Sequence, residues 1–327
     1  MSASTTVSQP QIRLVLANNG LSALGDLNKQ LTSLKLDGIA GIKDNKLDTA
    51  GAPQVPGGWQ IPADTPAREA EPKWPDFPDN AIINEVSKAV LGVYWPEFYK
   101  ENEANFVLVS DTISRLEREC KTISYPLRKD IYNAYKIKPQ DIKCIILGQD
   151  PYPGLNSDGK PAAQGYSFST ARNVKLQPSL ALIYEELLDS KMITKMPSHG
   201  DIASSWTPQG VMLFNAALTV RPGTPETHLG PWTAILLKTL NYIAEVRARI
   251  NKKCVIMLWG AKARKIITHR QFPDSMVVLQ AGHPSPLNRN CRQRGNPNGF
   301  IGCGHFAKCN ELLISQGEPP INWTVNA

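Results

Sequence analysis

Polar residues that could do acid–base chemistry follow directly on short apolar runs at several points of this chain. Asp150 and Tyr152 follow the run KCIIL, Asn215 follows VMLF, Gly260 follows CVIMLW, and His283 follows MVVLQ. Each of these residues alone has an ordinary interpretation as a turn residue or a strand-end cap. If the strands are neighbours, a carboxylate, an amide and an imidazole meet at one edge, and such a convergence is typical of an active site.

The elements that must position these residues are strands separated by helices. Nearly continuous apolar runs, typical of strands buried in a parallel sheet, occupy residues 143–147, 211–214, 254–259 and 276–280. Helix-like stretches lie between them at residues 178–190, 231–250 and 261–269. This alternation predicts an α/β fold with three layers, α/β/α, around a central, mainly parallel four-stranded sheet. Ligands of such sheets bind beyond the carboxyl ends of the strands, where the polar residues stand.

The composition divides the chain into three parts. Seven prolines stand among Gly, Asp and Glu between Gly51 and Asn80, which disfavours regular secondary structure. We therefore expect an accessory N-terminal extension over residues 1–50, a proline-rich linker over 51–84, and the catalytic domain over 85–327. The first twenty residues lack the apolar segment of a secretory signal, and their single Arg makes only a weak organelle presequence.

Charge and hydropathy narrow the class of protein. The 327 residues, 42% of them hydrophobic, suit one sizeable core plus an appendage. The net charge of +7 and a pI near 9.0 favour polyanionic partners such as nucleic acid. No apolar run reaches the roughly 18 residues of a membrane span, so the sequence predicts no membrane-spanning helix.

The six cysteines have no spacing typical of a disulfide framework, which fits a reducing compartment. Cys291, Cys303, His305 and Cys309 could be interpreted as a zinc site, because three thiols and an imidazole are suitable ligands. The spacing lacks the short Cys knuckle that usually orients the first two ligands. We therefore expect no metal at these residues.

Short motifs connect the polar residues to a known family. They are GQDPY (148–152), GYSFS (165–169), QPSL (177–180), LFNAALTVRPG (213–223), LWG (258–260), HPSPL (283–287) and GHFAKCNELL (304–313). In this order they resemble the uracil-DNA glycosylases of the common, family 1 type. The resemblance begins at about Trp95, continues to the C-terminus and leaves residues 1–80 uncovered.

The resemblance implies an enzyme of DNA repair that flips uracil out of DNA and hydrolyses its N-glycosidic bond, leaving an abasic site. Asp150 would stabilise the sugar cation and orient or deprotonate the attacking water, and His283 would hydrogen-bond O2 of the departing uracil. The uracil-binding residues would be Gln149, Tyr152, Phe168 and Asn215. No metal and no organic cofactor is implied.

Each base-binding residue has a distinct role in this resemblance. Asn215 would pair with O4 and N3–H of uracil, a pattern that cytosine cannot satisfy, and Phe168 would stack on the ring. Tyr152 would stand against C5, where thymine carries a methyl group. Because hydrophobic fit alone discriminates one methyl group poorly, we expect Pro151 and Pro153 to hold the phenol rigidly.

The DNA-binding residues that the resemblance implies are turns of small residues and one apolar wedge. They are Pro178, Ser179, Gly260, Ala261, Pro284, Ser285, Pro286 and Leu287. The small residues would let main-chain N–H groups approach phosphates, and Leu287 would enter the stack that the flipped nucleotide leaves. The implied partner is uracil-containing DNA, single- or double-stranded.

The chain departs from the family pattern in three places. Pro153 replaces the usual histidine after GQDPY, which predicts a lower or retuned rate. Ala261 replaces the usual serine after LWG, which removes one hydroxyl contact. The segment after HPSPL is longer than usual and carries Arg289, Arg292 and Arg294, which could contact phosphates or form a solvated loop.

Two other classes of function, a non-catalytic DNA-binding relative and a protein inhibitor or enzyme acting on free uridine, fit these residues less well. A non-catalytic DNA-binding or processivity relative could lose Asp150, Asn215 and His283, yet all three are present. An enzyme acting on free uridine would have no use for a wedge and phosphate-binding turns. We also expect a monomer, a location inside the cell, whether nuclear, cytoplasmic or in an organelle, and a possible replication or repair partner for the N-terminal extension.

Overall fold

The computed structural model describes residues 75, 77–267 and 272–326. Its sheet, within these residues, consists of β1 (Cys144–Gly148), β2 (Val211–Asn215), β3 (Cys254–Trp259) and β4 (Met276–Ala281). The strand order is β2-β1-β3-β4, and each neighbouring pair is parallel. The predicted four-stranded parallel sheet is therefore confirmed, with each strand within one residue of its predicted bounds.

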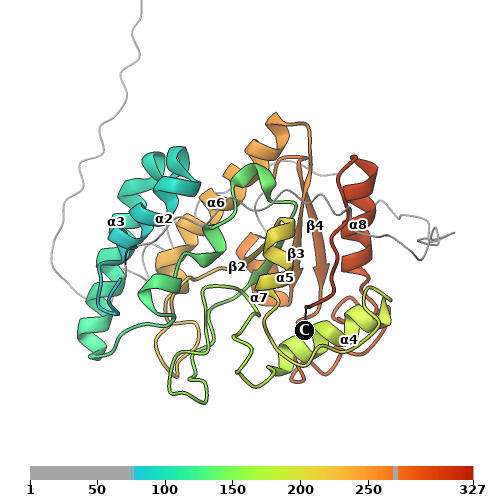
Figure 1. Ribbon diagram of the computed structural model, residues 1–327, viewed down its shortest axis with the longest axis horizontal. Coiled ribbons are helices and arrows are strands. Elements are labelled where there is room, and N and C mark those ends of the chain that lie inside the picture. The colour runs from blue at the N-terminus through green and yellow to red at the C-terminus, as the bar shows by residue number, and fades with distance from the viewer. Residues whose placement is uncertain (1–74, 76, 268–271, 327) are drawn as a thin grey trace, which may run out of the picture. The chain divides into compact units, whose positions relative to one another are not determined.

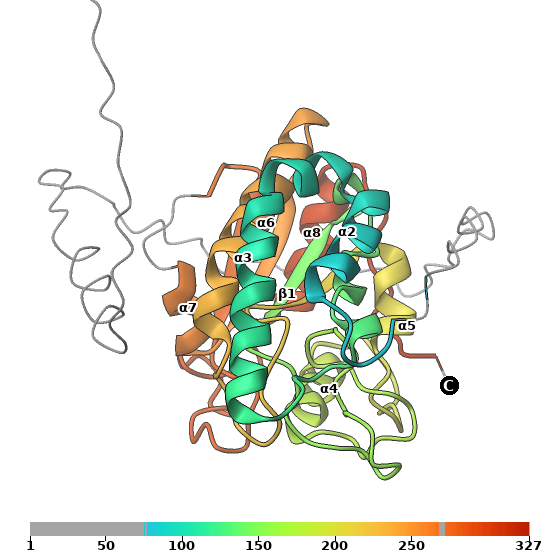
Figure 2. The same ribbon diagram turned by 90° about the vertical axis from the view of Figure 1, so that its left-hand side faces the viewer.

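Helices cover both faces of the sheet (Figure 1). On one face lie α2 (Ile83–Tyr94), α3 (Pro96–Cys120) and α6 (Leu229–Arg249), and α7 (Ala261–Ile267) contributes to the same core. On the other face lie α4 (Pro178–Asp189), α5 (Ala203–Trp206) and α8 (His305–Ser315). Figure 2 shows α3 and α6 in front of the sheet, with α8 behind it. The predicted three-layer α/β/α fold is confirmed.

Alternate residues of a strand point to opposite faces of the sheet, and each face is covered by its own helical layer. In β1, Ile145 and Leu147 belong to the core under α2, α3 and α6, whereas Cys144 and Ile146 belong to the core under α4 and α8. All five residues of β1 are buried, as expected for a strand with helices on both sides. The continuous apolar run of β1 therefore packs into the hydrophobic cores on both faces of the sheet.

The predicted helices form with small changes of boundary. Helix α4 begins at Pro178, whose fixed φ suits the first turn, and ends one residue before the predicted Ser190. Helix α6 begins at Leu229 and ends at Arg249. Short 3-10 helices, η1 (Arg128–Asp130), η2 (Asn133–Tyr135), η3 (Pro139–Asp141) and η4 (Thr207–Gln209), complete the helical segments that the structure describes. Residues 268 and 269 of the third predicted helix lie outside the described residues.

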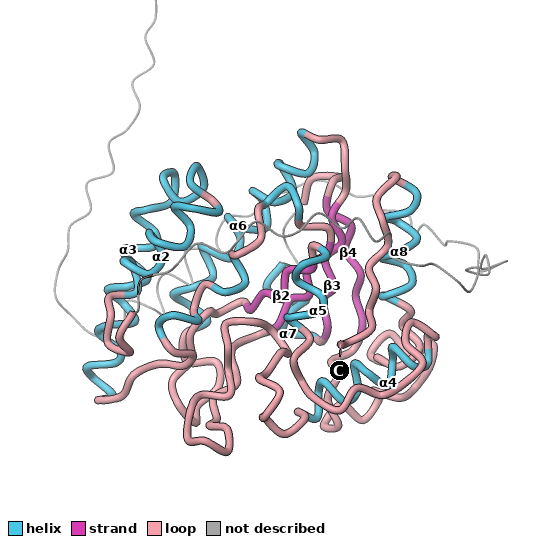
Figure 3. Tube along the Cα trace, viewed as in Figure 1, coloured by secondary structure: helices cyan, strands magenta, loops and turns pink. Residues whose placement is uncertain are grey.

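The order of the strands identifies where a ligand can bind. The chain moves from β1 to β2 on one side and from β3 to β4 on the other, so the connections diverge beyond the carboxyl ends of β1 and β3. In open parallel sheets this divergence leaves a crevice that holds the ligand. The long loops in Figure 3 gather at this end of the sheet.

The accessory extension (1–50) and most of the predicted linker (51–84) lie outside the described residues. At the end of the linker segment, Phe77 and Ala81 pack against the core, and α2 begins at Ile83. None of the helices in the described ranges is long and apolar enough to cross a bilayer.

Candidate active site

A pocket of about 400 Å³ opens where the connections from β1 and β3 diverge. Its wall comes from the end of β1, the start of α7, and two loops. The lining residues are Leu147, Gly148, Gln149, Phe168, Trp259, Gly260, Ala261, Lys262, Ala263, His283, Ser285, Leu287 and Asn288. Four of the motifs found in the sequence, GQDPY, GYSFS, LWG and HPSPL, therefore converge on one cavity.

Asp150 follows the pocket-lining Gln149 and is held by two N–H donors. The backbone N–H of Glu226 donates to its Oδ2 at 2.7 Å, and the Gln149 side-chain amide donates to its Oδ1 at 3.1 Å. Burial raises the pKa of Asp150 above its usual range, and the hydrogen bond from Glu226 opposes that rise. The carboxylate is therefore both oriented and partly desolvated.

Glu226 is a contributor that the sequence did not reveal. Its φ is +67°, a left-handed conformation that side chains other than Gly, Asn and Asp rarely adopt. Its backbone N–H is aimed at Asp150, while its carboxylate pairs with Lys262 of α7, which lines the pocket. Backbone strain of this kind collects at functional sites, where the surrounding structure maintains it.

Asn215 ends β2 beside Gly148, the last residue of β1. The two strand ends are paired in register, and Asn215 is 4% exposed. A Cβ added at Gly148 would lie 2.2 Å from Asn215 Oδ1 and 2.7 Å from Ser167 Cβ. Only glycine at position 148 leaves room for this amide. Asn215 thus adjoins the pocket through Gly148 and is not part of the lining itself.

The backbone conformation of Phe168 directs its ring toward the pocket. Its φ is +60°, and the N–H of Ser169 donates to the carbonyl of Ser167 at 2.7 Å, so Phe168 is the central residue of a γ-turn of the rare positive-φ kind. Ser167 fixes the turn, because its hydroxyl donates to the Ile146 carbonyl of β1 at 2.8 Å. The Phe168 ring lies 5.5 Å from the Trp259 ring and 6.5 Å from the His283 ring, centroid to centroid.

Tyr152 is tied to the same turn. Its hydroxyl donates to the Phe168 carbonyl at 3.1 Å, and burial raises the pKa of the phenol. Pro151 is buried and Pro153 half-buried, and the Pro153 carbonyl accepts from the N–H of Gly223 at 2.9 Å. The loop that was predicted to be rigid is therefore held at both prolines and at the phenol between them.

His283 enters the pocket wall from the loop after β4. Gly260, with φ +96°, approaches it so closely that a Cβ at Gly260 would lie 2.9 Å from the His283 Cβ. The imidazole is accessible from the pocket, while the protein on its other sides lowers its pKa by desolvation, and the charge of Lys262 lowers it further. The neutral imidazole is thus favoured.

The segment from His283 to Asn288, which we call the wedge turn, is a compact loop. The Ser285 hydroxyl accepts from the N–H of Leu287 at 3.2 Å, and the Asn288 amide donates to the His283 carbonyl at 3.1 Å. Leu287 is 92% exposed at its tip. A leucine presented in this way on a stiff turn has the form of an intercalating side chain.

The remaining predicted DNA-binding residues lie at the starts of two helices. Gly260 and Ala261 line the pocket at the start of α7. Pro178 and Ser179 form the first turn of α4, and they do not line the pocket. The structure therefore places two of the three predicted phosphate-binding turns at the pocket and the third on a separate element.

The four residues considered for zinc are engaged elsewhere, and the Cys303 thiol faces the Glu186 carboxylate at 3.6 Å. His305 Nδ1 accepts from the Trp259 indole N–H at 3.1 Å, and the Cys309 thiol contacts Cys144. Cys291 is buried in the core under α4 and α8. Across the described ranges, no group of three or more ligating side chains could hold a metal ion.

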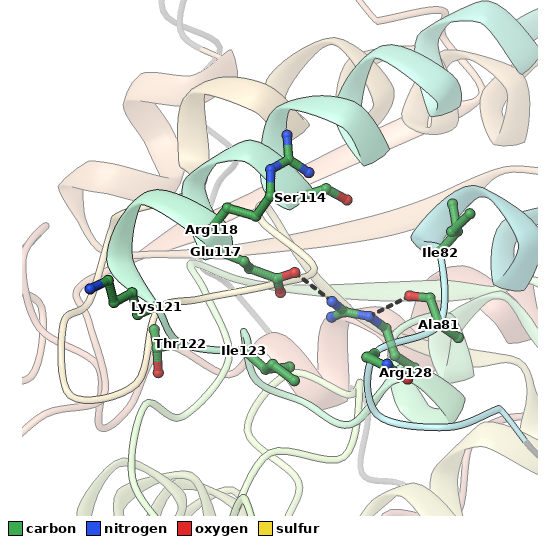
Figure 4. A pocket seen from close by; sticks show the side chains of 10 residues that line it. Ala81, Ile82, Ser114, Glu117, Arg118, Lys121, Thr122, Ile123 and Arg128 are labelled. Carbon is green, nitrogen blue, oxygen red and sulfur yellow. Dashed lines mark hydrogen bonds and ion pairs between the residues drawn. The ribbon is translucent and has the colours of Figure 1, made fainter.

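A second, larger hollow of about 620 Å³ lies between the start of α2 and the end of α3 (Figure 4). Its interactions are internal. The Arg128 Nη2 donates to Glu117 Oε2 at 2.6 Å and its Nε donates to the Ala81 carbonyl at 2.9 Å, as the dashed lines in Figure 4 mark. These contacts hold the chain after α3, so we assign this hollow a structural role.

A parallel α/β sheet with an oriented carboxylate, a buried amide and an imidazole at its switch point is the arrangement expected of an enzyme active site. The model of the uracil DNA glycosylase superfamily matches residues 135–314. The chain belongs to this family. The predicted family is thus confirmed, and with it the class of hydrolases that act on N-glycosyl bonds.

Individual relatives agree with this assignment. The uracil-DNA glycosylase of Aeromonas hydrophila is 39% identical over 231 residues, covering 68% of this chain and 93% of the relative. That of Dichelobacter nodosus is 37% identical over 254 residues, covering 76% and 98%. The crystal structure of mimivirus uracil-DNA glycosylase matches with a TM-score of 0.64 at 30% identity, covering 71% of this chain and 87% of the other.

Proposed function

We propose that Asp150 and His283 carry out the uracil excision that family membership assigns to this chain. The observation that supports this most is the environment of Asp150. Its carboxylate is fixed by two N–H donors beside a pocket whose wall holds the His283 imidazole. Such preorganised charge is the largest source of catalysis in many enzymes.

The chemistry follows from the charges that develop. As the bond between uracil and deoxyribose lengthens, the sugar acquires positive charge and the base acquires negative charge. Asp150 stabilises the sugar cation and positions the water that attacks it. A neutral His283 donates an N–H to the departing base without placing a second positive charge beside the sugar, which agrees with its lowered pKa.

Base recognition belongs to residues around the same pocket. Phe168 supplies the stacking surface, and Asn215 supplies the amide whose donor and acceptor match the edge of uracil. Tyr152 closes the side where thymine carries its methyl group, and Gln149 supports the carboxylate next to it. The hydrogen bond from Tyr152 to Phe168 joins the wall and the stacking surface into one unit.

Binding of uracil-containing DNA, single- or double-stranded, completes the proposal. Leu287 is the wedge, and the turns at Pro178–Ser179, Gly260–Ala261 and Pro284–Pro286 contact phosphates. We expect the chain to act as a monomer inside the cell, in a nuclear, cytoplasmic or organellar compartment. A replication or repair partner for residues 1–80 stays a prediction.

Incubation of the chain with an oligonucleotide that carries one uracil, followed by alkali, tests the proposal. The expected result is cleavage at the uracil and release of the free base, with no cleavage of matched strands that carry thymine or cytosine there. A chain that binds the uracil strand and leaves it intact would instead be a non-catalytic relative.

A further inference from the structure

The extended segment after the wedge turn, residues 289–304, is attached to helix α4. We call this segment the basic loop, because it carries Arg289, Arg292 and Arg294. Arg292 forms a bidentate pair with Glu185, with Nε to Oε1 at 2.8 Å and Nη2 to Oε2 at 2.6 Å. Arg294 forms a second bidentate pair with Asp189, one turn further along α4.

A third acidic residue of α4 joins the same contact from the core. Glu186 is fully buried, and its carboxylate accepts from the backbone N–H groups of Gly302 and Gly304, the latter at 2.9 Å. The three carboxylates Glu185, Glu186 and Asp189 form what we call the acidic face of α4. They hold both the start and the end of the basic loop.

The ion pairs connect to the wedge turn through a short, hydrogen-bonded path. Asn288 donates to the His283 carbonyl at 3.1 Å, and its own carbonyl accepts from the N–H of Cys291 at 2.9 Å. Cys291 is 2% exposed and immediately precedes Arg292. A displacement of Arg292 would therefore be transmitted to the residues that support Leu287.

The carboxylates of these pairs belong to helix α4, whose first turn we propose to bind DNA. Glu185 lies six residues after Ser179 in α4, or about 9 Å along the helix axis at 1.5 Å per residue. The pairs thus join the wedge turn to the helix whose first turn, Pro178–Ser179, is proposed to bind a phosphate. Because the guanidinium groups of Arg292 and Arg294 already face carboxylates, the basic loop offers less free positive charge than its sequence indicates.

We propose that the pairs Arg292–Glu185 and Arg294–Asp189 set the spacing between the wedge turn and the start of α4, and so adapt this chain to uracil in duplex DNA. This rests on the proposed function. The four side chains are positioning residues. Extraction of a base from a duplex requires the wedge and the phosphate contacts to act together, because the base must be both unpaired and unstacked. The free-energy cost of flipping is lower for a uracil in a single strand, which has no partner base.

The test compares excision from one uracil-containing sequence as a single strand and as a duplex. Glu185→Gln and Arg292→Gln should each lower kcat/KM on the duplex by about fivefold, the effect of one good surface ion pair, with the single-strand value almost unchanged. The exchange Glu185→Arg with Arg292→Glu should restore the duplex value. Arg289→Gln removes a charge from the same loop outside both pairs and is the matched control. It should leave the ratio of the duplex to the single-strand kcat/KM unchanged.

Other outcomes would overturn the proposal. Equal losses of kcat/KM on the duplex and on the single strand would show that the pairs have only a general structural role. Values unchanged from the native chain on both substrates in all variants would show that the pairs have no role in excision. If Arg292→Gln alone weakened binding and reduced the slope of log affinity against log salt by about 0.9, Arg292 would contact a phosphate instead. A native chain inactive on both substrates would refute the proposed function as well, which distinguishes the two failures.

Discussion

At the scale of the residue, the roles proposed for Asp150 and His283 depend on their protonation states. The proposed chemistry needs an ionised Asp150 carboxylate and a neutral His283 imidazole. Burial raises the pKa of Asp150 above about 3.9, and desolvation lowers that of His283 below about 6.5, the usual values of these groups. The two shifts thus have opposite directions, and a fall in pH acts against both required states.

This predicts the pH dependence of excision. As the pH falls, Asp150 gains a proton and loses its charge, and His283 gains a proton and becomes cationic, so the rate should fall in acid. The raised pKa of Asp150 places its loss of charge at a higher pH than for an ordinary Asp, and the lowered pKa of His283 keeps the imidazole neutral to a lower pH than for an ordinary His. His283, whose pKa lies below its usual value, should cause no loss of rate as the pH rises from 7 to 8. Single-turnover rates from acid pH to pH 8 measure the profile. A limb with its midpoint near pH 8 would contradict the assigned protonation states.

The hydroxyl and the ring of Tyr152 have separable effects. Tyr152→Phe removes only the hydrogen bond to the Phe168 carbonyl and should keep strict rejection of thymine. Tyr152→Ala removes the wall at C5 and should permit slow release of thymine, because a methyl group then meets no side chain. Chromatographic detection of free thymine distinguishes the two variants. Thymine release by neither variant would remove Tyr152 from the pocket assignment.

At the scale of the element, the close approach of β1 and β2 positions the Asn215 amide that we propose recognises the base. Gly148→Ala would place a Cβ 2.2 Å from Asn215 Oδ1, so the amide would have to move. We expect excision of uracil to fall by at least about tenfold and rejection of cytosine to weaken, because unpaired polar groups in a buried site discriminate strongly. Gly154→Ala, where nothing lies within 4 Å of the added Cβ, is the control and should be nearly neutral.

The elements were predictable from the sequence where the physical signal is local. Four continuous apolar runs became four buried parallel strands, because a strand between two helical layers has no polar face. The supports of the site were not predictable. The N–H that holds Asp150 comes from Glu226, 76 positions away, and the partner of Arg292 is 107 positions away. Such contacts depend on loop geometry that no local pattern encodes.

At the scale of the whole molecule, a buried ion pair supports the layer formed by α2 and α3. Arg128 is 2% exposed, and burial would raise the pKa of Glu117, but hydrogen bonds from Arg128 and Ser124 lower it overall. The folded-state pKa of Glu117 is thus below its unfolded value. The stabilisation is complete above about pH 4.3 and is lost as the pH falls through the folded-state value.

Removal of this cation should destabilise the fold at neutral pH. Arg128→Met leaves Glu117 buried without its partner, which typically costs about 3–5 kcal/mol. Arg115→Gln breaks an exposed pair with Glu119 on the same helix, where both side chains are more than half exposed, and should cost less than about 0.5 kcal/mol. Urea unfolding at pH 7 compares the two variants. Equal midpoints would refute the structural role given to the hollow in Figure 4.

The central claim is that one carboxylate, oriented at the carboxyl end of β1, makes this fold a uracil-excising enzyme. It is tested most directly by the single-turnover release of uracil from duplex DNA by the native chain and by Asp150→Asn. The amide keeps the shape of the side chain and can still accept the hydrogen bond from Glu226, so binding of DNA should persist. We predict release by the native chain and a loss of about 10³-fold or more in the variant. A variant within tenfold of the native rate would contradict the account.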